Sequence, residues 1–104
     1  MVAPEILNQV VARLVERFHP QRIILFGSQA RGDADSRSDV DLLVVYPFEG
    51  RRLEAMWDLE KAMGDLPVAT DLIPLTPEQY EDDRRSVNTL AAIADREGRL
   101  LYAA

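Results

Sequence analysis

The sequence predicts an α/β (α+β) fold in which helices pack on a small mixed sheet of three or four strands. Short apolar runs, typical of buried strands, alternate along the chain with segments whose apolar residues recur at helical spacing. The link between the first two apolar runs has only about a dozen residues and little helical pattern, so a standard parallel crossover does not fit there. With 104 residues the chain has the size of one domain, and we expect a single domain over residues 1–104.

The first element that the sequence predicts is an amphipathic helix over residues 4–18. Pro4 is tolerated in the first turn of a helix, and His19-Pro20 ends the pattern. The apolar residues at helical spacing are Ile6, Leu7, Val10, Val11, Leu14, Val15 and Phe18. Because this stripe is wide, we expect part of it to face something beyond the domain's own core, as a candidate interface.

Two strands joined by a polar loop come next. The apolar run Arg22–Phe26 ends at Gly27 and is predicted to be a buried strand. Residues 28–38 are polar and contain Gly, Asp and Ser, so we expect a loop with room for one helical turn. Asp39–Tyr46 is predicted to be the second strand, which Pro47 closes.

A helix and a third strand are predicted in the middle of the chain. The helix covers about residues 51–63, with Gly64 as its C-terminal cap. We expect its apolar side chains to lie in the core: Leu53, Met56 and Trp57. The run Val68–Ile73 is predicted to be the third strand, and Pro74 is expected to stop it.

The last part of the chain predicts two helices and a short edge strand. Pro77-Glu78 can open a short helix, and Ser86 is expected to cap a final helix that ends at Gly98. The inner face of this final helix is predicted to hold Val87, Leu90, Ala91 and Ala94. The tail Arg99–Tyr102 is expected to add the edge strand.

The composition argues against several classes of function. Basic residues number 12 and acidic ones 18, and the net charge of −6 makes the chain a poor candidate for binding a long nucleic acid. The lack of cysteine excludes disulfides, thiolate zinc sites and cysteine nucleophiles, and one histidine leaves little material for a Ser-His-Asp triad. No apolar stretch approaches the roughly 20 residues of a membrane span, so we expect a soluble cytoplasmic protein with no membrane partner.

Three carboxylates stand out because of their positions in the predicted strands. Asp39 and Asp41 open the second strand, and the period-2 alternation of a strand puts both on one face, about 6.5–7 Å apart. Asp71 lies within the third strand, where burial and strand propensity both disfavour an aspartate. Three acids that converge on a sheet repel one another unless a cation neutralises them. Oxygen ligands without His or Cys select Mg²⁺ or Mn²⁺.

A second candidate element is Gly27-Ser28, directly after the first strand. Glycine lets a ligand approach the backbone closely, and the serine offers a hydroxyl. Free N–H groups and a hydroxyl at such a turn suit an anion. Either feature alone is most often structural: a D-x-D pair at a strand edge is usually a solvated turn, and Gly-Ser after a strand is usually a simple turn. Together, a phosphate cradle beside a carboxylate cluster is the equipment of nucleotidyl transfer.

Gly27-Ser28, ten further residues and Asp39-Val40-Asp41 resemble the G-S-x10-D-x-D signature of the DNA polymerase β-like nucleotidyltransferase superfamily. The run GSQARGDADSRSDVDLLVV is similar to the minimal nucleotidyltransferases, small prokaryotic proteins of about this size. The resemblance spans the chain and implies the polymerase β-like palm fold of a single minimal nucleotidyltransferase domain. Asp71 falls where the family has its third carboxylate, a match that rests on position alone.

The resemblance implies a role for each of these residues. Asp39, Asp41 and Asp71 would be the catalytic residues and the ligands of two Mg²⁺ or Mn²⁺ ions, with Asp71 favouring deprotonation of the attacking hydroxyl. Gly27 and Ser28 would hold the phosphates of ATP, the substrate. Arg31 follows the serine by three residues and could reach these phosphates, but a solvated loop arginine or an ion pair with a loop acid at 33 or 35 fits equally well.

The resemblance also implies a partner. Minimal nucleotidyltransferases commonly act as antitoxins of small helical HEPN-domain toxins, moving AMP from ATP onto a tyrosine of the toxin. We therefore expect a protein adenylyltransferase whose acceptor comes from a partner encoded by a neighbouring gene. Two alternatives stay open: an aminoglycoside-type nucleotidyltransferase that needs a partner subunit, and a non-catalytic module that neutralises its partner by binding alone.

Overall fold

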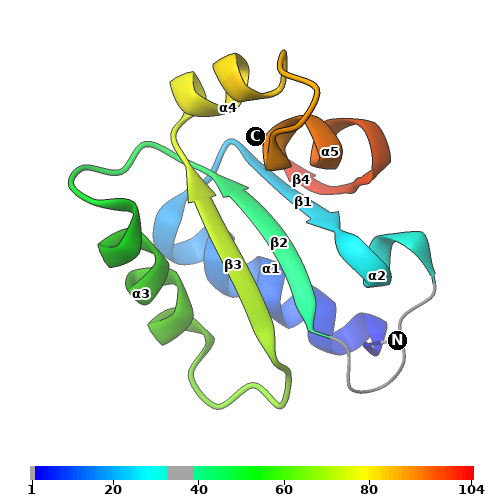
Figure 1. Cartoon of the computed structure of the whole chain (residues 1–104). Coiled ribbons are helices and arrows are strands. Elements are labelled where there is room, and N and C mark those ends of the chain that lie inside the picture. Colours follow the sequence, from blue (N-terminus) through cyan, green and yellow to red (C-terminus); the bar gives the residue numbers. More distant parts are fainter. Residues whose placement is uncertain (1, 33–38) are drawn as a thin grey trace.

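The computed structural model describes residues 2–32 and 39–104 and confirms the mixed α/β architecture (Figure 1). Its elements in chain order are α1 Pro4–Phe18, β1 Arg22–Phe26, α2 Gly27–Arg31, β2 Val40–Val45, α3 Arg52–Met63, β3 Thr70–Leu75, α4 Pro77–Asp83, α5 Leu90–Glu97 and β4 Arg99–Ala103. The bounds of α1 and β1 match the predicted ranges. The helical turn expected in the polar loop is α2, which begins one residue earlier, at Gly27.

The four strands form one sheet in the order β3-β2-β1-β4. β1 pairs antiparallel with β2 and β4, whereas β2 pairs parallel with β3, so the sheet is mixed as predicted. The register sets Phe26 opposite Asp41 and Asp41 opposite Asp71. The end of β1 therefore lies beside the beginnings of β2 and β3.

Helices cover both faces of the sheet (Figure 1). On one face, here called the α1 face, α1 and α3 bury a core that includes Leu14, Leu42 and Leu59. On the other, here called the α5 face, α4 and α5 bury a smaller core with Leu43 and Tyr80. Odd-numbered positions of β2 and β3 point to the α5 face, because successive side chains of a strand alternate.

Only part of the apolar stripe of α1 is buried. Val10 and Leu14 are fully buried against the sheet, whereas Leu7, Val11 and Val15 are half-buried. Leu7, Val11 and Val15 pack at the edge of the core and stay partly exposed, so an interface along this stripe remains a prediction. Over residues 2–32 and 39–104, no helix combines the length and apolar character that crossing a membrane requires.

The third strand is displaced from its predicted range and runs from Thr70 to Leu75. The expectation that Pro74 stops this strand is wrong, because Pro74 pairs with Val44 in the ladder and is buried. β3 is an edge strand, and proline is tolerated there because its missing N–H can face away from the ladder.

The cap of the last helix also differs from the prediction. The cap is Thr89 and not Ser86: its hydroxyl accepts a hydrogen bond from the Ala92 N–H at 3.1 Å and donates to the Asp83 carbonyl. Val87 therefore precedes the helix and is 74% exposed, so its predicted place on the inner face is wrong. Both residues are good caps, and the contact with α4 decides between them.

The prediction that Leu53, Met56 and Trp57 of α3 lie in the core is wrong for two of the three residues. Leu53 and Trp57 are 53% and 57% exposed, and only Met56 of the three expected core residues is half-buried. The buried residues of α3 are Ala55, Leu59, Ala62 and Met63. Apolar residues lie on two sides of this helix, and the small residues allow its other side to approach the sheet closely.

Candidate active site

Two carboxylates face each other across the β2–β3 pair. Asp41 and Asp71 are partners in the parallel register, and neighbouring strands lie about 4.8 Å apart. Paired residues of a sheet share a face, and both odd-numbered positions lie on the α5 face. Asp71 is the second residue of β3 rather than a mid-strand residue, and its side chain is exposed. The structure thus brings together two acids that are 30 positions apart in the chain.

Asp39 lies one residue before β2 and is exposed. Its charge and that of Asp71 both raise the pKa of Asp41, although burial of Asp41 is the largest cause. The guanidinium of Arg31 lowers the same pKa. The charges of Asp39, Asp71 and Arg31 therefore all act on Asp41. The grouping of Asp39, Asp41 and Asp71 as one metal site stays a prediction.

Gly27 brings the backbone against this acidic group. It has a φ of +73°, and a Cβ built on it would lie 2.3 Å from Oδ2 of Asp41. A side chain at this position would displace the Asp41 carboxylate, and an L-residue would also be strained at this φ. Ser28 follows directly and is half-buried in the first turn of α2. Of the two elements that the sequence singled out, Gly27 and the Asp41 carboxylate therefore lie side by side.

Arg31 is the last residue of α2 and is exposed, with its charge close enough to influence Asp41. The loop acids at positions 33 and 35, offered as its alternative partners, lie outside the residues that the structure describes. Its influence on the pKa of Asp41 shows that Arg31 lies near the acidic group.

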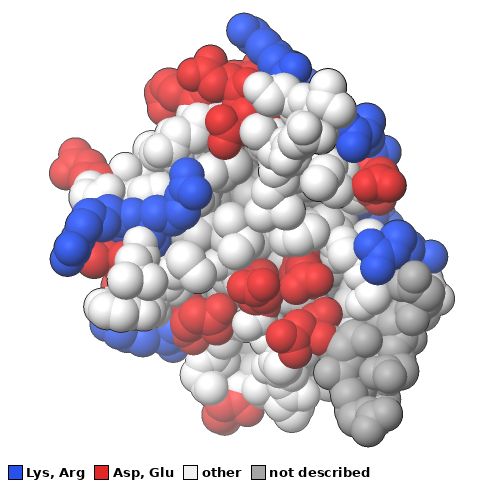
Figure 2. All heavy atoms as spheres, viewed as in Figure 1, with Lys and Arg blue, Asp and Glu red and all other residues white. Residues whose placement is uncertain are grey.

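The donor set suits a hard divalent cation. Figure 2 shows acidic side chains gathered on the α5 face where β2 and β3 begin. Among residues 2–32 and 39–104, no three acidic or histidine side chains stand close enough together to ligate one ion as they are. Like charges hold carboxylates apart, and a cation removes that repulsion. Carboxylate oxygens with neither His nor Cys fit Mg²⁺ or Mn²⁺.

The site is open on the α5 face. α4 follows the end of β3 and covers the opposite end of the sheet from the beginnings of β2 and β3 (Figure 1). Phe26 and Ile73 are only partly buried, and Asp71 is exposed. The Asp71 carboxylate is therefore accessible from this face.

One residue at the site was missed by the sequence analysis. Gln29, next to Ser28, is only 5% exposed, and its Oε1 accepts a hydrogen bond from the Val2 N–H at 3.2 Å. The side chain ties the start of the chain to α2 and so fixes the turn that carries Ser28. A glutamine in a polar segment carries no signal of burial, so only the fold reveals this role.

Comparison with known proteins agrees with this geometry. The family model for the nucleotidyltransferase domain matches residues 7–94. A Methanocaldococcus jannaschii protein named "Putative protein adenylyltransferase MJ0126" is 36% identical over 87 residues, covering 76% of this chain and 88% of that protein.

Two solved structures have a similar fold. The first, a crystal structure of a toxin–antitoxin with AMP-PNP, has a TM-score of 0.66 and 25% identity, covering 93% of this chain and 73% of the matched chain. The second, of tri-AMPylated Shewanella oneidensis HEPN toxin in complex with MNT antitoxin, has a TM-score of 0.58. It is 22% identical, covers 96% of this chain and 71% of the matched chain, and shows the fold alone.

Proposed function

The chain belongs to the nucleotidyltransferase domain family, and on that premise we propose that it transfers AMP from ATP to a tyrosine hydroxyl of a small helical HEPN-type toxin. The observation that carries the proposal is the register of Asp41 with Asp71 beside Gly27. This register places two carboxylates beside a glycine turn, an arrangement that suits a cation-bound polyphosphate.

We assign Asp39, Asp41 and Asp71 as the residues that would hold two Mg²⁺ or Mn²⁺ ions. Their oxygens are the donors that these ions prefer, and their mutual repulsion falls when a cation binds. The bound ions would neutralise phosphate charge and make the acceptor hydroxyl easier to deprotonate.

Gly27, Ser28 and Arg31 would hold the phosphates of ATP. Gly27 has no side chain to obstruct an approach to Asp41, and Ser28 supplies a hydroxyl directly beside it. Arg31 adds a positive charge whose influence already reaches Asp41. These groups orient the triphosphate so that its α-phosphorus faces the open side of the site.

The reaction then follows from positioning and charge. The carboxylate of Asp71 favours loss of the acceptor's hydroxyl proton, and the oxygen attacks the α-phosphorus in line. A bond forms between that oxygen and the phosphorus, the bond from the phosphorus to the bridging oxygen breaks, and pyrophosphate leaves. The products are AMP esterified to the acceptor, pyrophosphate and the released proton.

The relatives support the choice of acceptor. The name of the M. jannaschii relative gives a protein as the acceptor of AMP, and one similar fold occurs in a toxin–antitoxin complex with an ATP analogue. Another occurs with a HEPN toxin that carries AMP groups. Asp39 and Asp71 are exposed, so an acceptor group of a partner protein can approach them.

Intact mass spectrometry tests the proposal directly. The chain is incubated with ATP, Mg²⁺ and the HEPN-type product of the neighbouring gene, which should gain the mass of one or more AMP groups. Asp41→Asn and chelation by EDTA should each abolish the gain. Asp82→Asn, at an exposed position on α4 away from the site, is the matched control and should leave transfer intact.

Two results would contradict protein adenylylation. A partner that is bound and silenced without any gain in mass would support a non-catalytic binding module. Transfer of AMP to an aminoglycoside but not to the partner would support a small-molecule nucleotidyltransferase.

A further inference from the structure

An apolar groove of about 540 Å³ lies on the α1 face, between α1 and β4. Leu7, Val11 and Val15 form its α1 wall, and Leu101 belongs to its β4 wall. β4 ends the sheet on this side, so no further strand of the described chain borders the groove. The groove is separate from the acidic site, which lies on the opposite face.

The α1 wall has the shape of a helix-packing surface. Leu7, Val11 and Val15 are spaced by four residues and form one ridge, with the small Ala12 beside it. Ridges of this kind pack into the groove beside another helix. A helix with the same spacing is thus a suitable occupant, and α1 itself is such a helix.

The charges on the two walls are opposite. Glu16 lies on the α1 wall and Arg99 on the β4 wall, and both side chains are exposed. A second α1 that entered the groove would set its own Glu16 against β4 and Arg99. The walls are therefore complementary to each other, which is what a two-fold interface between identical chains needs.

We propose that this chain forms a two-fold homodimer in which α1 of each copy fills the groove of the other. The contact buries the ridge of half-buried aliphatic side chains on both copies. It also pairs Glu16 of each copy with Arg99 of the other, so one dimer holds two such ion pairs.

The groove that the second copy would occupy lies next to the segments that carry the proposed catalytic residues, on the opposite face of the sheet. Leu25, Gln29 and Val40 also line the groove, and Val40 stands between Asp39 and Asp41. Gln29 is the neighbour of Ser28 in α2. Dimer formation therefore covers these segments on the α1 face and leaves the α5 face, which carries the acids, uncovered.

Sedimentation velocity over a concentration series, with the chain alone, tests the proposal. The wild type should dimerise reversibly. Glu16→Arg and Arg99→Glu should each weaken the dimer about tenfold or more, because each reversal sets like charges together at two places. The double variant with both reversals should restore the wild-type dissociation constant. Glu5→Arg, an exposed position on α1 outside the groove, should change nothing.

Val11→Glu gives a second, stronger disruption and should make the chain monomeric while circular dichroism shows it folded. A wild type that stays monomeric at all concentrations would overturn the proposal. This holds even if Val11→Glu then blocks binding of a different, helical partner, because the groove would serve that partner and not a second copy. Dimers that persist in Val11→Glu, or charge reversals that do not rescue each other, would also overturn it. None of these results depends on adenylyl transfer.

Discussion

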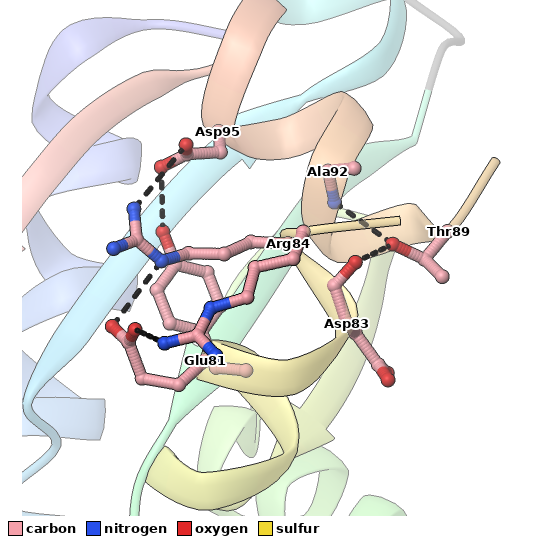
Figure 3. Close-up of polar contacts among 8 residues, drawn as sticks. Glu81, Asp83, Arg84, Thr89, Ala92 and Asp95 are labelled. Carbon is pink, nitrogen blue, oxygen red and sulfur yellow. Dashed lines mark hydrogen bonds and ion pairs between the residues drawn. The ribbon is translucent and has the colours of Figure 1, made fainter. Parts of the chain in front are cut away.

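At one end of the α5 face the carboxylates of Asp95 and Glu81 lie against Arg84 (Figure 3), whereas at the other end Asp41 faces Asp71 across the β2–β3 pair. In the first region, Tyr80 is 3% exposed, and its hydroxyl donates to Oδ1 of Asp95 at 2.9 Å. Nε of Arg84 is 3.2 Å from Oε1 of Glu81, and its Nη1 is 3.6 Å from Oδ2 of Asp95.

The two regions differ in how their charges are balanced. The α4–α5 network pairs each acid with a group that donates to it, and such a network links two helices without needing a ligand. At the beginnings of β2 and β3, by contrast, burial of Asp41 and then the charges of Asp71 and Asp39 raise the pKa of Asp41. Like charges that the fold keeps side by side indicate a candidate functional site, whereas the carboxylates of the α4–α5 network have partners within the fold.

The largest expected effect is the loss of transfer in Asp41→Asn and Asp71→Asn. Each change removes a carboxylate from the acidic group, and the rate of AMP transfer should fall by about 100- to 1,000-fold. The free energy of unfolding should stay the same or rise slightly, because repulsion is relieved. Asp95→Asn is the matched control from the other region and should lower stability while leaving transfer by the folded protein intact.

Mass spectrometry of the acceptor and urea unfolding measure the two quantities. If Asp71→Asn transferred AMP normally, the third acid would be misassigned. If Asp95→Asn abolished transfer in a folded protein, the division between the two regions would be wrong.

Gly27→Ala should give the next largest effect. At a φ of +73° the new side chain costs about 1–2 kcal/mol of stability, and its Cβ would also collide with Oδ2 of Asp41. Gly32→Ala is a matched control, since Gly32 has a φ of +82° and, apart from its chain neighbours, no atom of residues 2–32 or 39–104 lies within 4 Å of a Cβ there. Both variants should lose stability, but only Gly27→Ala should also lose transfer, as measured by the same two assays. Equal transfer in both would contradict a close approach of the backbone to the site.

Ser28→Ala should have a smaller effect on transfer. The backbone of the turn remains, and one hydroxyl that bonds a charged phosphate is lost, so transfer should fall about 10- to 100-fold. Ser86→Ala, at an exposed serine between α4 and α5, should leave the rate unchanged. Single-turnover rates at saturating ATP measure both variants, and an unchanged rate in Ser28→Ala would remove the hydroxyl from the site.

Local pattern was sufficient to predict α1, β1 and the positions of Gly27, Ser28, Asp39 and Asp41, because each depends on spacing within one segment. The pairing of Asp41 with Asp71 depends on the register between β2 and β3. That register is set by packing of α3, which joins the two strands, and a single sequence does not encode it in any short pattern.

The exposed Trp57 and the cap at Thr89 show a second limit. Trp57 is an aromatic residue of the kind usually found in a core, but it is exposed. The side of α3 that packs on the sheet is the one whose small residues let the helix lie close to the strands. Thr89 rather than Ser86 caps α5 because its hydroxyl also donates to the Asp83 carbonyl at the end of α4. In both cases a contact between distant elements overrides a local preference.

The smallest expected effect concerns the pH dependence of the α4–α5 network. Burial, followed by the hydrogen bond to Asp95, raises the pKa of Tyr80 above its ordinary value of 10.0. The folded chain therefore keeps the Tyr80 proton at a pH where the unfolded chain loses it, and its stabilising contribution is complete below pH 10.0 and declines as the pH rises from there through the raised pKa. Tyr80→Phe should cost about 1–2 kcal/mol at neutral pH, and this difference from the wild type should shrink as the pH passes 10.0. Urea unfolding of both proteins from neutral to alkaline pH measures the difference. A difference that stays constant across the series would show that the Tyr80 hydroxyl is not held by Asp95. The α4–α5 network could then no longer be described as one in which each acid has a donor.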